Sequence, residues 1–201
     1  MRSSFIVTRL GRISWAVPIG LLLITTAVMA QGTPAVPTTA PSPKTIGTYN
    51  QEIYQGMQAV VLRAAEVMPE EGYQFKPVDT VRTFGQILGH IADSQYYFCS
   101  IVLGGQHPSP RVEKTRTTKA ELIAALKDAF AYGDRAHAGL TDAAAAEMVK
   151  LMGNDAPKLG VLTTNSLHTV EHYGNLVTYL RMKGLVPPTS DPTFMQGMRK
   201  Q

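Results

Sequence analysis

The chain has 201 residues, 44% of them hydrophobic and 17% charged, which is the composition of a folded protein with room for one ordinary domain beyond its N-terminus. Its net charge of +4 comes mostly from the first 30 residues, which hold three of the 19 basic residues and none of the 15 acidic ones. The remainder is nearly neutral and has no basic cluster with interleaved aromatic residues, which argues against a nucleic-acid partner.

Residues 1–30 have the pattern of a secretory signal peptide. Three arginines precede a short apolar run over residues 13–24, and small residues at positions 28 and 30 favour cleavage before Gln31. We therefore expect an exported protein, periplasmic or secreted, with no stable membrane insertion after cleavage. The alternative is an uncleaved N-terminal membrane anchor, because the apolar stretch reaches about 18 residues if it is extended to residue 30.

Residues 31–45 hold four prolines separated by small and hydroxyl side chains, a composition typical of a disordered linker. The folded domain is expected to span residues 46–188. Residues 189–201 are interpreted as a flexible tail.

The domain is predicted to be helical throughout. A first apolar stripe recurs every three or four residues from Tyr49 to Val67 and is stopped by Pro69. A second helix is expected to follow Asp79, a candidate N-cap, and to end at Gly104, whose type favours a helix C-terminus.

A third helix is predicted to open with a capping box formed by Thr118 and Glu121. Residues 141–155 indicate at most one short helix, and no segment shows a strong two-residue alternation. The last helix is expected from about Leu159 to Lys183. Four amphipathic helices of this length predict an all-α four-helix bundle, in which ligands are held by side chains that face one another.

The histidine pattern indicates a metal site. His168 and His172 are four residues apart on one predicted helix, so both can reach one ion. His90 lies mid-helix between two isoleucines, on the core side, while His137 could face either way and His107 lies in an apparent loop. Buried imidazoles without a common partner would leave ring nitrogens unsatisfied, whereas three neutral imidazoles suit a borderline divalent ion.

The segment from His168 to His172 also spells H-x-x-E-H, the signature of inverzincin peptidases. Such an enzyme needs a further acidic ligand well downstream. Only 29 residues follow His172, none of them is glutamate, and the one acid is Asp191 in the expected tail. The sequence therefore disfavours a peptidase.

Two stretches, FGQILGHIADSQYYFCSIVLGG and HTVEHYGNLVTYLRMKGLVPP, resemble the DinB/YfiT-like family. The resemblance spans about residues 49–188. It implies a four-helix bundle with a long crossover connection and a divalent metal, zinc or nickel, held by three histidines. Those ligands correspond to His90, His168 and His172, with His137 as a fallback.

Three histidines leave coordination positions open, as in a catalytic site. The resemblance implies a metal-dependent enzyme that activates water or a thiol for an unidentified small-molecule substrate, because characterised relatives include thiol-dependent transferases and isomerases. Their thiol cofactors are cytosolic, whereas this chain carries an export pattern, so a hydrolase is the other expectation. A noncatalytic bundle that binds a metal or ligand is the alternative from another class. A homodimer is expected only because dimers are common among such bundles.

Four other residues are candidates for the surroundings of the metal. Asp93 and Ser94 follow the first histidine by three and four residues, close enough to hydrogen-bond near it. Asn165 shares the face of the histidine pair and is expected to line a pocket. Glu171 is turned about 100° away from its histidine neighbour, which favours a surface or supporting role over catalysis. The single cysteine, Cys99, is expected to be a small buried hydrophobe.

Overall fold

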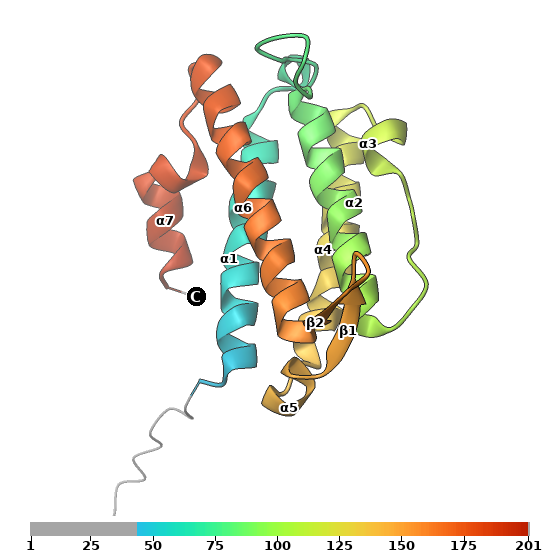
Figure 1. Cartoon of the computed structure of the whole chain (residues 1–201). Coiled ribbons are helices and arrows are strands. Elements are labelled where there is room, and N and C mark those ends of the chain that lie inside the picture. Colours follow the sequence, from blue (N-terminus) through green and yellow to red (C-terminus); the bar gives the residue numbers. More distant parts are fainter. Residues whose placement is uncertain (1–43, 201) are drawn as a thin grey trace, which may run out of the picture. The chain divides into compact units, whose positions relative to one another are not determined.

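Four long helices form the bundle in residues 44–200, the part of the chain that our computed structural model describes (Figure 1). They are α1 (Ile46–Val67), α2 (Phe84–Leu103), α4 (Lys119–Ala138) and α6 (Lys158–Met182). The expected signal peptide and nearly all of the expected linker lie outside the described residues and stay predictions. Within residues 44–200, no helix combines the length and apolar character needed to cross a membrane.

The bundle has one long crossover connection. α1 and α2 each pack against α4 and α6, so α1 and α2 lie diagonally opposite one another. Figure 1 shows α1 and α6 running in one direction and α2 and α4 in the other. The chain therefore returns along the outside of the bundle between α2 and α4, through the short helix α3 (Val112–Thr115). This arrangement confirms the predicted all-α bundle with a long crossover.

The predicted start of the second helix was wrong. α2 begins at Phe84, because Thr83 accepts from the backbone N–H of Gln86 and the Gln86 side chain accepts from the backbone N–H of Thr83. Asp79 is exposed instead and pairs with Lys76 at 2.9 Å. The other predicted capping box, at the start of α4, is confirmed.

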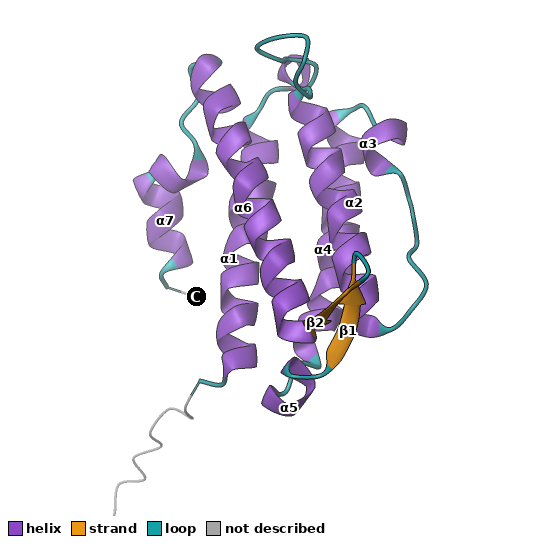
Figure 2. Cartoon of the chain, in the orientation of Figure 1, coloured by secondary structure: helices purple, strands orange, loops and turns teal. Residues whose placement is uncertain are grey.

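A small β-hairpin was missed in residues 141–155. The region contains α5 (Asp142–Ala145), followed by antiparallel strands β1 (Met148–Leu151) and β2 (Asn154–Pro157), drawn as arrows in Figure 2. Both residues of the connecting turn, Met152 and Gly153, have positive φ angles, which is the geometry of a tight two-residue hairpin turn. Strands of four residues are too short for their alternation to stand out in the sequence.

The expected flexible tail also contains structure. A 3₁₀ turn, η2 (Pro188–Ser190), leads into α7 (Pro192–Met198). Asp191 caps α7 by accepting from two backbone N–H groups, and proline is favoured at the first helical position. Phe194 and Met198 pack against the main hydrophobic core, which explains why this segment is ordered.

The interior contains an uncharged polar network as well as apolar side chains. Asn165 of α6 donates to Gln95 of α2 at 2.7 Å, and Gln95 donates to Thr169 at 3.1 Å. All three residues are buried, so these hydrogen bonds replace contacts with water that folding removes. The network joins α2 to α6, the two helices that carry the candidate histidines.

The crossover is held tightly against α2 beside His90. A Cβ atom placed on Gly89 would lie 2.6 Å from Cα of Glu113, so only glycine allows this approach. One turn later, the Asp93 carboxylate accepts from the backbone N–H groups of Val112 and Glu113 at 2.8 and 3.1 Å. These are the first N–H groups of α3, which have no partner within that helix.

We expect Gly89→Ala to push the crossover away from α2 and to lower the free energy of unfolding by roughly 1–3 kcal/mol, the usual cost of overpacking. Urea unfolding measures the change. Gly174→Ala is the matched control, because Gly174 is also inside a long helix but its Cβ position is open. That control should be neutral or stabilising by up to about 1 kcal/mol. Equal stability of the two variants would contradict the close contact.

Candidate metal centre

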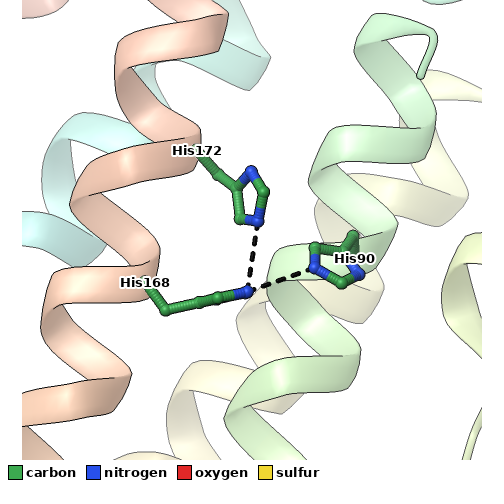
Figure 3. Close-up of side chains that lie close together, drawn as sticks. All are labelled: His90, His168 and His172. Carbon is green, nitrogen blue, oxygen red and sulfur yellow. Dashed lines mark hydrogen bonds between the residues drawn. The ribbon is translucent and has the colours of Figure 1, made fainter. Parts of the chain in front are cut away.

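Three histidines from two helices converge on one point (Figure 3). His90 projects from α2, and His168 and His172 project from successive turns of α6. The Nε2 atom of His168 lies 3.2 Å from Nε2 of His90 and 3.1 Å from Nε2 of His172. All three ligand atoms lie within 4.8 Å of one another. The residues singled out by spacing therefore form one cluster that could hold a metal ion.

The outer ring nitrogens of two of these histidines contact oxygen acceptors. Nδ1 of His90 lies 3.1 Å from a carboxylate oxygen of Glu113, and Nδ1 of His172 lies 3.3 Å from the amide oxygen of Asn175. An N–H at each Nδ1 satisfies these contacts, and it leaves the lone pair of each Nε2 directed at the centre of the cluster. This is the tautomer that a metal ligand requires.

The donor set fits a divalent ion better than it fits a hydrogen-bonded cluster. In a metal-free cluster with those tautomers, only His168 can carry a proton on Nε2. That single N–H would then have to serve the Nε2 atoms of both His90 and His172 as acceptors. Zinc–nitrogen bonds of about 2.0–2.1 Å place ligand nitrogens about 3.4 Å apart in a tetrahedral site and about 2.9 Å apart at right angles. The observed separations of 3.1 and 3.2 Å lie between these values.

Burial favours the neutral form of two of the three histidines. Burial, together with the neighbouring histidines, lowers the pKa of His168 to about 4. The pKa of His90 is also lowered, first by burial and then by the charge of Arg82, although Glu113 opposes the shift. Metal ligands must be deprotonated, so both shifts favour ion binding at neutral pH.

Asp93 and Ser94 lie close to the site but contact the backbone. Asp93 holds the start of α3, as described above, and thereby places Glu113 near the cluster. The Ser94 hydroxyl donates to the carbonyl of His90 at 2.8 Å, a contact within α2. The hydrogen bonds of both residues therefore reach the histidines only through the main chain.

Asn165, Glu171 and Cys99 have different surroundings. Asn165 lies in the interior network and is fully buried, so the structure does not place it on an open pocket wall. Glu171 is exposed and lines a surface cavity next to His172. Cys99 is completely buried, and burial raises the pKa of its thiol to about 12, which makes it unreactive, as the sequence indicated.

Sequence reasoning missed three residues around the cluster: Glu113, Arg82 and Asn175. One oxygen of Glu113 contacts His90 and the other accepts from Nε of Arg82 at 2.9 Å. Asn175 follows His172 by three residues on the same helix, so helical spacing could have identified it. No local pattern could have identified Glu113, since its partner depends on how the crossover folds back.

His137, the fallback ligand, lies outside the cluster. It is 2% exposed and its ring stacks on Tyr54 with centroids 4.0 Å apart. Neither ring nitrogen has a hydrogen-bond partner among the residues that the structure describes. Burial lowers the pKa of His137 to about 4, so it is neutral in the folded protein. His107 is exposed on the crossover, as expected.

A surface cavity of about 680 Å³ reaches the cluster. His172 and Glu113 form part of its wall, together with the segment before α2 and the second half of α6. The volume is within the range of small-molecule sites. A substrate in this cavity would lie beside an ion held by the histidines.

Comparison with known proteins agrees with this fold. Residues 53–176 match the sequence model of the DinB superfamily. A DinB-like protein from Bacillus cereus superposes with a TM-score of 0.62 at 16% identity, over 69% of this chain and 93% of that chain. A DinB-like protein from Bacillus subtilis gives 0.56 at 21% identity, over 67% and 92%. A search of the curated proteins gives no significant match.

The buried position of His137 predicts a pH-dependent stability. Unfolding restores an ordinary histidine pKa of about 6.5. Between about pH 6.5 and pH 4, His137 is therefore protonated in the unfolded chain and neutral in the folded one. The contribution of His137 to the free energy of unfolding is fully present above about pH 6.5, and it is lost as the pH falls toward 4. Urea unfolding at pH 7 and pH 5 should therefore show a loss about 2 kcal/mol smaller in His137→Phe than in the wild type. His107→Phe, on the exposed crossover, should behave as the wild type, and an equal loss in all three proteins would contradict the prediction.

Proposed function

The chain belongs to the DinB superfamily, and on that premise we propose that it is a metal-dependent enzyme whose ion, zinc or nickel, is held by His90, His168 and His172. The observation that carries the proposal is the convergence of three Nε2 atoms while two of the outer nitrogens contact oxygen acceptors. When bound, the ion would supply Lewis acidity and lower the pKa of a water or thiol beside it.

The protein's own residues supply rigidity and access. All three ligands project from long helices that pack in the bundle, so their positions need little rearrangement. Glu113 and Asn175 orient the His90 and His172 rings through their outer nitrogens. The cavity beside His172 admits a small molecule, and a site with three protein ligands leaves a coordination position for it at the ion.

The export pattern of residues 1–30 favours hydrolysis over thiol transfer, since the thiol cofactors of characterised relatives are cytosolic. We therefore propose an exported hydrolase that acts on a small molecule, with thiol transfer as the other reaction. Zinc-loaded protein should turn over at least one substrate in a screen of esters, amides and thiol-transfer pairs, and His168→Ala should abolish that turnover.

One observation favours the noncatalytic alternative. Glu113, the carboxylate in contact with the cluster, is engaged through both oxygens, so it is not a free general base. A bundle that binds a metal or ligand without catalysis requires no such base. A complete screen without turnover, by protein that retains its metal, would favour this alternative.

Metal analysis tests the proposed site directly. Purified wild-type protein should contain about one equivalent of divalent metal, and the double variant His168→Ala/His172→Ala should contain none, because one imidazole cannot hold the ion. His107→Ala is the matched control, since it removes an exposed histidine outside the cluster, and it should keep the metal. Wild-type protein that takes up no metal would refute the proposal.

The contact between Glu113 and His90 predicts a specific effect on affinity. Glu113→Gln replaces a charged acceptor with a neutral amide, so we expect zinc to bind 10–100-fold more weakly, the usual effect of losing a carboxylate partner behind a histidine ligand. Competition with a chromogenic chelator measures the affinity. Glu171→Gln removes a nearby charge that is exposed on the cavity wall, and it should weaken binding much less. A larger effect in Glu171→Gln would contradict the assigned role of Glu113.

A further inference from the structure

The cavity beside the cluster has one cationic wall residue, Arg82, which lies in the segment just before α2. Two contacts fix this residue. Its Nε donates to Glu113 at 2.9 Å, and its backbone carbonyl accepts from the Tyr179 hydroxyl at 2.8 Å. The side chain is 43% exposed. Arg82 is therefore held in place on the wall while part of its guanidinium faces solvent.

The outer edge of the guanidinium is available to a ligand. Within residues 44–200, the Nη groups of Arg82 have no hydrogen-bond acceptor, although Nε is engaged. Two parallel N–H groups on one edge match the two oxygens of a carboxylate. Because Glu113 already fixes the conformation of the Arg82 side chain, little side-chain entropy would be lost on binding.

The charge of the cavity favours an anion. The charges of Arg82 and Glu113 cancel one another. A divalent ion at the histidines would carry two positive charges against the single negative charge of Glu171, so the cavity with the ion bound is net positive. The free edge of the Arg82 guanidinium matches the planar pair of oxygens of a carboxylate. The side chains of Val81, Ile87 and Tyr179 form an apolar part of the wall. These features together suit a carboxylate on an apolar body.

We propose that Arg82 binds the carboxylate of a small substrate whose apolar body occupies the cavity between the segment 77–82 and α6. This inference rests on the function proposed above and names its substrate class. Glu113 contacts both Arg82 and His90, so it fixes the distance between the bound carboxylate and the metal ligands. Arg82 is then the residue that decides which part of the substrate lies at the ion.

The test uses matched pairs of probes and variants. Phenylacetate and 4-phenylbutanoate are each compared with their amides, which have the same shape but no charge, by calorimetric titration of the full chain with and without zinc. The carboxylates should bind about tenfold more tightly than the amides, and Arg82→Gln should remove that difference while keeping a donor for Glu113. Arg63→Gln is the matched control, because Arg63 is an exposed arginine paired with a glutamate on α1, at 3.5 Å.

Three results would overturn the inference: equal affinity of carboxylate and amide for the wild type, no measurable binding of either carboxylate, or a preference that survives in Arg82→Gln. Zinc content is measured in the same samples. One equivalent of zinc without a carboxylate preference leaves the metal centre intact and removes only the Arg82 inference. If neither the wild type nor the variants take up zinc, the proposed function fails. The role of Arg82 is then decided by the zinc-free titrations, in which the wild type should still prefer the carboxylate over the amide and Arg82→Gln should not.

Discussion

The carboxylate of Glu113 is the contact on which the candidate site depends. One of its oxygens meets His90 and the other meets Arg82, so a single side chain orients a candidate ligand and a wall residue of the cavity. It can do so only because the crossover lies in close contact with α2 at Gly89 and is hydrogen-bonded there to Asp93. The long connection therefore completes a site that the four main helices leave unfinished.

The crossover has an energetic cost that the bundle must offset. Ser109 and Arg111, just before α3, both have positive φ angles, which are unfavourable for residues other than glycine. Two hydrogen bonds from the start of α3 to Asp93, which is partly buried, oppose this strain. Val112, the residue before Glu113, is also buried in the main hydrophobic core, so the position of Glu113 is fixed by its immediate neighbours on the crossover.

Much of the fold and the central part of the site could be predicted, because both depend on local spacing. His168 and His172 share a face by helical geometry alone, and His90 lies on an apolar face that must point inward. Features set by distant contacts could not be predicted. Glu113 is brought to His90 by the path of the crossover, and α7 is ordered because Phe194 reaches the core.

The interior amides of Gln95 and Asn165 have a further consequence for the way α2 meets α6. Apolar contacts are not directional, so by themselves they specify the relative position of two helices less sharply than a hydrogen bond does. A shift of one turn, about 5.4 Å, would break the hydrogen bond between these two amides and cost roughly 1–3 kcal/mol for each buried polar group left unpaired. Their hydrogen bond therefore fixes the axial register of the two helices, and with it the level at which histidines from both helices meet.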